Sequence, residues 1–123
     1  MDEREGGLAA WQWRLYPDGH RDRRNLLVHA ITVPLFELGT LALAGAAIAG
    51  RSWPAPAGLA LVAVALVAQK RGHAVEATAP VPFRGPGDLA ARFLVEQWWT
   101  FPRYVLSGGF ARAWQAAAPR VAP

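Results

Sequence analysis

Two apolar stretches joined by a short turn constrain the fold of this chain more than any other feature. Residues 26–50 hold one acid, Glu37, and one imidazole, His29, among mostly small and aliphatic residues. Residues 54–68 carry no charge, and this stretch extends over 54–73 if its polar end continues the helix. A helix of about 25 residues rises about 37 Å, enough to cross a bilayer core of about 30 Å. We therefore expect an all-α, small integral membrane bundle built on a transmembrane hairpin, rather than two buried helices of a soluble bundle.

The basic residues flank the hairpin and largely avoid its turn. Of 13 Lys and Arg residues, five precede the first stretch, seven follow the second, and Arg51 alone lies in the turn. The positive-inside rule then predicts that both termini are cytoplasmic, in an inner-membrane or endoplasmic-reticulum type of membrane. A nucleic-acid partner is not expected despite the net charge of +4, because no basic run lies on a polar helix face.

Three shorter segments accompany the hairpin. Residues 11–25 mix aromatic, basic, His and Asn side chains and suit a membrane interface. Residues 88–101 predict an amphipathic helix ended by Pro102, and residues 110–118 predict another. The whole chain, 1–123, is expected to form a single membrane domain.

All three histidines of the chain are expected at one end of this hairpin. His29 lies early in the first stretch, His73 ends the second, and His20 precedes His29 by nine residues across a Pro-Asp-Gly turn. Glu76 follows His73 by three residues and shares its helix face. Imidazole nitrogens bind Fe, Zn and Cu, and an added carboxylate suits non-haem Fe(II). The sequence therefore predicts a metal site of His20, His29 and His73, with Glu76 as a catalytic residue that is either a ligand or its neighbour.

Further polar residues are candidates for supporting roles. Asn25 precedes His29 by four residues, so it is expected to orient the imidazole ring. Glu37 lies about 12 Å deeper along the helix, where an ionisable group is costly and is functional, protonated or paired. Glu96 is interpreted as the partner of Arg92, four residues earlier, with a place in the site as the alternative.

The spacing of these residues resembles that of a known family. The pattern is Tyr16-x-x-x-His20-x-x-x-x-Asn25-x-x-x-His29-x-x-x-x-Pro34, then Gln69-x-x-Gly72-His73-x-x-Glu76-x-x-x-Pro80. It is similar to the 2-hydroxy fatty acid dioxygenases, small membrane proteins typified by the fungal enzyme that converts phytosphingosine-derived 2-hydroxy fatty acids to odd-numbered ones. The similarity covers residues 16–34 and 69–83, and elsewhere only the hydropathy agrees.

The resemblance implies an integral membrane dioxygenase that depends on Fe(II). Such an enzyme would use O2 to remove the carboxyl carbon of a long-chain 2-hydroxy acid by α-oxidation, in contact with membrane lipid. His20, His29 and His73 match the family's histidines, which are taken as iron ligands, and Tyr16 belongs to the same pattern.

The chain departs from the family pattern at three places. Thr32 stands where the family usually has glycine, and Glu76 follows the last histidine by three residues where four are expected. Lys70 and Arg71 replace apolar residues, which suggests a basic rim that holds a substrate carboxylate with Arg24.

Other functions remain open at the level of the sequence. A haem-binding subunit would use His29 and His73 as axial ligands and leave His20 without a role. A non-catalytic membrane protein would associate, with a partner or as a homo-oligomer, through small residues such as Gly39 and Gly45. Zinc in place of iron would favour a hydrolytic or structural site.

Overall fold

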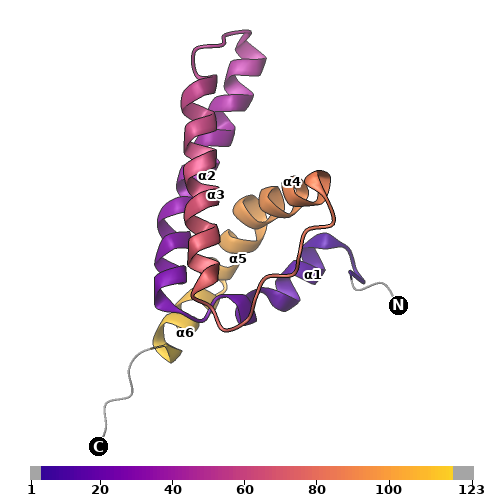
Figure 1. Ribbon diagram of the computed structural model, residues 1–123, viewed down its shortest axis with the longest axis vertical. Coiled ribbons are helices and arrows are strands. Elements are labelled where there is room, and N and C mark those ends of the chain that lie inside the picture. Colours follow the sequence, from indigo (N-terminus) through magenta and orange to yellow (C-terminus); the bar gives the residue numbers. More distant parts are fainter. Residues whose placement is uncertain (1–3, 118–123) are drawn as a thin grey trace, which may run out of the picture.

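A computed structural model describes residues 4–117 of the chain, and all of the regular secondary structure within these residues is helical, without strands. The expected all-α fold is thus confirmed. Its longest elements are α2 (Arg23–Ala49) and α3 (Ala55–Ala74), which run side by side as an antiparallel hairpin (Figure 1). The others are α1 (Leu8–Leu15), the 3-10 turn η1 (Tyr16–Gly19), α4 (Pro86–Val95), the π-helical turn η2 (Glu96–Thr100), α5 (Phe101–Leu106) and α6 (Gly109–Ala116).

Local sequence signals explain the bounds of α2. The Asp22 carboxylate accepts a hydrogen bond from the Arg24 amide at 2.8 Å, so it satisfies one of the free N–H groups at the helix start. Gly50 ends the helix with φ at 63°, a left-handed conformation that glycine adopts without steric cost. Pro34 lies inside α2 and does not end it.

The hairpin helices approach most closely at a pair of glycines. A Cβ atom on Gly39 would lie 2.8 Å from the carbonyl oxygen of Gly58, and a Cβ on Gly58 would lie 2.8 Å from that of Gly39. Only glycine permits such a backbone contact. Gly45 has no neighbour within 4 Å of its Cβ position, so Gly39 alone of these two expected association residues is used inside the hairpin.

The chain after the hairpin differs from the prediction at Pro102. The helix expected to stop there continues through η2 and α5, and Pro102 lies in the first turn of α5, directly after the π-helical turn. The π-helical turn just before it takes up one extra residue. The last helix, predicted over 110–118, is observed as Gly109–Ala116, and residue 118 lies outside the described residues.

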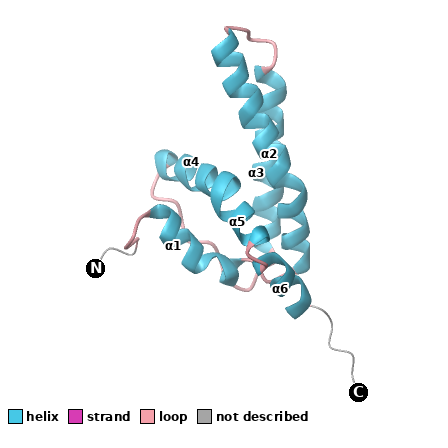
Figure 2. Ribbon diagram, turned by 180° about the vertical axis from the view of Figure 1, so that it is seen from behind, coloured by secondary structure: helices cyan, strands magenta, loops and turns pink. Residues whose placement is uncertain are grey.

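The buried core gathers at the open end of the hairpin, away from its turn. There η1, α5 and α6 lie beside the start of α2 and the end of α3, whereas the half of the hairpin near the turn stands clear of the other helices (Figures 1 and 2). The core cluster comprises Tyr16, Leu26, Val33, Phe101 and Tyr104.

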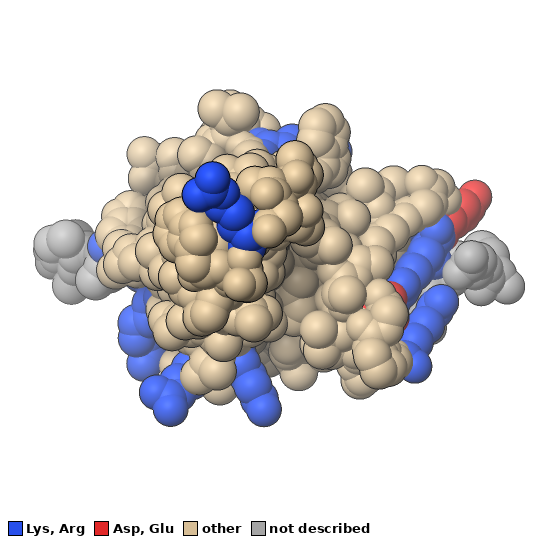
Figure 3. All heavy atoms as spheres, turned by 90° about the horizontal axis from the view of Figure 1, so that it is seen from above, with Lys and Arg blue, Asp and Glu red and all other residues tan. Residues whose placement is uncertain are grey.

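Within residues 4–117, α2 is the one helix that is both long and apolar enough to cross a membrane. The second helix that was expected to span, α3, is not apolar enough over a sufficient length, since it carries Lys70 and Arg71 near its end. Apolar side chains such as Leu38 and Ile48 on α2 and Val67 on α3 are exposed. Viewed from the turn end, the surface of the molecule is largely uncharged, and most of its basic side chains lie toward the margins (Figure 3).

Candidate metal centre

Four side chains converge at the open end of the hairpin: those of His20, His29, His73 and Glu96. One ligand atom from each lies within 4.8 Å of the ligand atoms of the other three, so the group could hold a metal ion. The structure thus brings together the three histidines predicted from the sequence. The carboxylate beside them is Glu96 and not Glu76, which corrects the expected ligand set.

The rings of His20 and His29 are held by backbone carbonyls. Nδ1 of His20 lies 2.8 Å from the Tyr16 carbonyl oxygen, and Nδ1 of His29 lies 3.0 Å from that of Asn25. A carbonyl oxygen only accepts hydrogen bonds, so each Nδ1 carries a proton, and Nε2 is the nitrogen of each ring that is left to bind a metal ion. The two Nε2 atoms lie 3.3 Å apart. Two nitrogens at this distance are held together by a shared proton or by a bound cation.

The spacing of the ligand atoms suits a metal ion. Nε2 of His20 and Nε2 of His29 each lie 3.6 Å from Oε2 of Glu96, and 3.3 Å from one another. In a tetrahedral site with bonds of about 2.1 Å, neighbouring ligand atoms lie about 3.4 Å apart. Nδ1 of His73 is buried without a hydrogen-bond partner among the described residues, which fits a nitrogen that would bind a metal ion.

Glu96 enters the centre from η2, the π-helical turn. Burial disfavours its charged form, but hydrogen bonds from His20 and His29, and the positive charge these rings carry when Nε2 is protonated, outweigh burial and hold the pKa of Glu96 well below its usual value. A carboxylate that stays ionised among imidazoles adds negative charge where a cation would bind.

The expected ion pair between Arg92 and Glu96 is replaced by another. Nη1 of Arg92 lies 3.7 Å from Oδ2 of Asp88 and donates to the Pro82 carbonyl at 3.2 Å. This leaves the Glu96 carboxylate directed at the histidines. Sequence reasoning set Glu96 aside because the i, i+4 spacing offered a simpler partner.

Tyr16 lies against the centre. Its ring stacks on His20 with centroids 3.8 Å apart and planes inclined by 17°, and it packs edge-on against Tyr104 at 5.0 Å. The buried hydroxyl has no hydrogen-bond partner of regular geometry among the described residues. Burial, and then the charge of Glu96, raise the pKa of Tyr16 well above its usual value, so the phenol keeps its proton.

Glu76 and Asn25 support the centre from outside. Oε1 of Glu76 accepts hydrogen bonds from the amides of Arg21 and Asp22 and from Nδ2 of Asn25, at 2.9–3.0 Å. Glu76 thus fixes the chain between His20 and α2 and offers no ligand to the centre. The ring of His29 is oriented by the backbone carbonyl of Asn25, whereas the prediction used the Asn25 side chain.

Thr32, at which the chain departs from the family pattern, has a definite role. Its hydroxyl donates to the Val28 carbonyl at 2.6 Å and accepts a hydrogen bond from Nε2 of Gln69 at 3.0 Å. The side chain of Gln69 in turn pairs with that of Gln97, next to Glu96. A glycine at position 32 would leave Gln69 without this acceptor.

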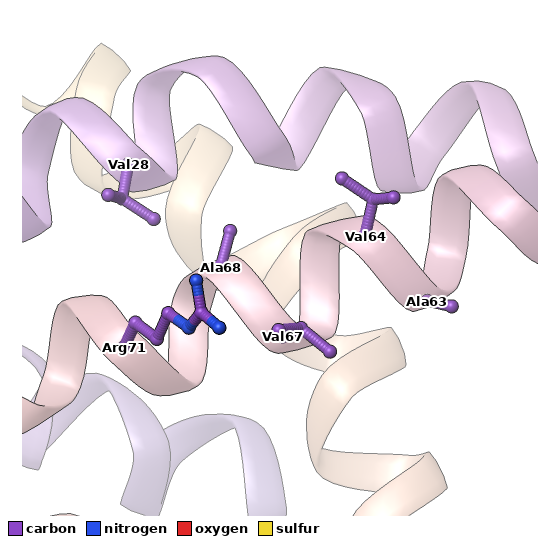
Figure 4. A pocket seen from close by; sticks show the side chains of 6 residues that line it. All are labelled: Val28, Ala63, Val64, Val67, Ala68 and Arg71. Carbon is purple, nitrogen blue, oxygen red and sulfur yellow. The ribbon is translucent and has the colours of Figure 1, made fainter.

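The basic residues expected to hold a substrate carboxylate lie away from the centre. Arg24 is exposed and pairs with Asp22 at 2.8 Å, and Lys70 is exposed. Arg71 lines a groove of about 490 Å³ on the hairpin with five apolar side chains of α2 and α3 (Figure 4). Arg71 and His73 are two residues apart on α3, about 200° around the helix, so the groove and the centre occupy different faces.

Glu37 lies outside the centre, about two helical turns from His29. The Thr40 hydroxyl donates to the Glu37 backbone carbonyl at 3.0 Å and accepts from Nε1 of Trp98 at 3.1 Å. The Glu37 carboxylate itself has no hydrogen bond or ion pair with any residue from 4 to 117, which does not support the paired interpretation.

Comparison with known proteins finds no matching family model, curated protein or solved structure.

Proposed function

We propose that this protein is a membrane enzyme that binds Fe(II) through His20, His29, His73 and Glu96 and oxidises a long-chain 2-hydroxy acid with O2. The observation that carries the proposal is the 3.3 Å approach of two imidazole Nε2 atoms whose Nδ1 atoms are both committed to carbonyl oxygens. The resemblance of the His and Asn spacing to the 2-hydroxy fatty acid dioxygenases supplies the reaction.

The donor set favours a metal of intermediate softness. Three imidazole nitrogens and one carboxylate oxygen, without a thiolate, suit Fe(II), and the same donors bind zinc. Fe(II) bound there would supply the activation of O2. His20, His29, His73 and Glu96 would hold the ion, and the Tyr16 phenol beside them would donate a hydrogen bond to an oxygen of the bound acid.

A second hollow offers a better place for the substrate than the Arg71 groove. It has a volume of about 590 Å³ and is lined by Arg21, Arg112, Tyr104 and alanines of α6. The Tyr104 ring contacts Tyr16 and lies 6.4 Å from the ring of His20. Two guanidinium groups suit a carboxylate, so we assign the acid's head group to this side of the molecule.

A membrane location is proposed from the surface of the hairpin. Only 33% of the most apolar window of α2 is buried inside the molecule, which is low for the core helix of a soluble protein. Ile48 is 88% exposed and Trp53 is 75% exposed. Side chains of this kind are covered by lipid when both α2 and α3 span, with the metal centre and both termini on the cytoplasmic side.

The geometry disfavours a haem. A porphyrin between His29 and His73 would have to displace His20 and Glu96, which fill the same space. The haem alternative also leaves His20 without a role, whereas the proposed centre uses it.

The proposal is tested with protein purified anaerobically from a membrane fraction. We expect about one iron per chain, O2 consumption that depends on Fe(II), and conversion of a 2-hydroxy acid to the acid one carbon shorter with CO2 and water, one O2 for each acid. His73→Ala should lose both metal and turnover. Zinc alone, with no activation by iron, would overturn the oxygenase and favour a hydrolytic or structural site; full function in the histidine variants would favour a non-catalytic membrane protein.

A further inference from the structure

A buried chain of amides lies directly behind Glu96. The side chains of Gln69 and Gln97 exchange hydrogen bonds, with Gln69 Nε2 to Gln97 Oε1 at 2.8 Å and Gln97 Nε2 to Gln69 Oε1 at 2.9 Å. Both side chains are essentially inaccessible to solvent, with exposures of 1% and 0%. Polar groups this deeply buried are costly unless every donor and acceptor is used.

The second N–H of each amide is also used, and this gives the chain a direction. Gln69 Nε2 donates its other hydrogen to Thr32 Oγ1 at 3.0 Å, and Gln97 Nε2 donates its other hydrogen to Oε1 of Glu96 at 3.3 Å. An amide has two such hydrogens, so all four are satisfied. The chain therefore runs from Thr32 through both glutamines to the carboxylate of the metal centre.

The orientation of both amides follows from Thr32. Its hydroxyl proton is committed to the Val28 carbonyl at 2.6 Å, so Oγ1 faces Gln69 as an acceptor only. Gln69 must then turn its NH2 group toward Thr32 and its oxygen toward Gln97. Gln97 must accordingly present its NH2 group to Glu96. A flip of either amide would bring oxygen against oxygen.

We propose that Gln97 is a positioning residue of the metal centre, holding Oε1 of Glu96 so that the carboxylate offers Oε2 alone to the metal ion. Oε2 is the atom that lies 3.6 Å from Nε2 of both His20 and His29. Coordination through a single oxygen keeps one position free for substrate or O2. This inference rests on the proposed metal centre, and it adds that Glu96 would bind the metal ion through Oε2 alone.

The test uses Co²⁺ as a spectroscopic probe on the full-length protein in detergent. Gln97→Met keeps the length of the side chain and removes the amide, which frees Oε1 to join Oε2 on the metal. We expect Co²⁺ affinity to fall about 10- to 100-fold, the range for residues that orient a metal ligand. The visible band of bound Co²⁺ should also lose intensity as the coordination number rises.

Gln12→Met is the matched control. Gln12 also anchors the π-helical turn, because its Oε1 accepts a hydrogen bond from Thr100 and its Nε2 donates to the Arg92 carbonyl at 3.0 Å. It shows no hydrogen bond to Glu96. We expect Gln12→Met to lower the thermal unfolding midpoint while the Co²⁺ affinity and spectrum stay as in the wild type.

The outcomes distinguish the positioning role of Gln97 from the existence of the metal centre. Equal Co²⁺ affinity and an unchanged spectrum in Gln97→Met would overturn the positioning role, while binding in the wild type would leave the metal centre standing. Failure of the wild type to bind Co²⁺ or Fe²⁺ would instead overturn the proposed function itself. If Gln97→Met does not fold, Thr32→Val serves as the second variant, since it removes only the acceptor at the far end of the chain; it should weaken Co²⁺ binding by a smaller factor, and an unchanged affinity would contradict the proposal.

Discussion

Asn25 and Gly72 touch where α2 and α3 meet at the open end of the hairpin, and Oδ1 of Asn25 fills the space that a Cβ atom on Gly72 would need. The Asn25 amide donates to the Gly19 carbonyl at 3.1 Å and to Glu76 at 3.0 Å. The Asn25 carbonyl holds the ring of His29. This contact therefore connects the helix pairing to the placement of a metal ligand.

Gly72→Ala should both destabilise the protein and weaken metal binding. The new methyl group displaces the Asn25 side chain, and overpacking of this kind costs about 1–3 kcal/mol. Thermal unfolding and Co²⁺ titration measure the two effects. Gly45→Ala is the control, because a Cβ atom there would contact nothing within 4 Å beyond its chain neighbours and the backbone of its own helix. A Gly72→Ala protein with wild-type stability and metal affinity would show that the contact is not required.

Substitutions of Glu96 and Glu76 should distinguish a metal ligand from a residue that supports the metal centre. Glu96→Gln removes the charged ligand and should lower metal affinity sharply. Glu76→Gln should keep the metal content near one per chain and lower stability, because its oxygen loses the charge that strengthens three hydrogen bonds, which costs about 1–2 kcal/mol. Metal analysis paired with thermal unfolding distinguishes them. The interpretation fails if Glu76→Gln is the variant that loses metal.

A substitution in the glycine pair of the hairpin should lower the stability of the fold without changing metal binding. In Gly39→Ala the methyl group would meet the Gly58 carbonyl at 2.8 Å and force the helices apart, at a cost of about 1–3 kcal/mol. Gly39 is ten residues from His29, about 15 Å along α2, so the centre should keep its metal. Unchanged unfolding together with a loss of metal would contradict this division.

Stability at low pH should depend on Asp88. Hydrogen bonds from the Arg4 side chain and the Arg84 amide hold the pKa of Asp88 well below its usual value. The pKa in the unfolded chain is about 3.9, so this contribution is complete above that pH and is lost as the pH falls through the lower folded value. The wild-type unfolding midpoint should thus fall more steeply below about pH 4 than that of Asp88→Asn. If the unfolding midpoints of the two proteins change in parallel with pH, Asp88 does not contribute to the loss of stability at low pH.

Cysteine labelling tests the proposed topology. Ser52→Cys in the hairpin turn should react only from the side opposite the cytoplasm, and Ala74→Cys at the end of α3 only from the cytoplasmic side. Labelling of both positions from one side would show that α3 does not span.

The sequence sufficed for the hairpin and its histidines because both depend on local signals. Apolar runs set the lengths of α2 and α3, and two antiparallel helices necessarily bring His29 and His73 to one end. His20 follows from its short distance along the chain. No tertiary information beyond the pairing of two neighbouring helices was needed.

Glu96 required more than the sequence could supply. It lies 23 residues after His73, and its direction depends on how α4 and η2 cross the hairpin. A π-helical turn has no reliable residue signature, so the faces of residues 96–104 could not be assigned by a 3.6-residue period. Glu76 was favoured because it shares a helix face with His73 in a regular helix, whereas α3 ends at Ala74.

The extra residue of the π-helical turn sets the angle around the helix between Glu96 in the metal centre and Tyr104 in the core. Deleting one residue from η2 would restore a regular helix and rotate Glu96 by about 100° relative to Tyr104. Either the carboxylate would leave the histidines or Tyr104 would leave the core. Insertions and deletions can therefore be absorbed in the hairpin turn, which is remote from these residues, but the count of residues between Glu96 and Tyr104 is fixed.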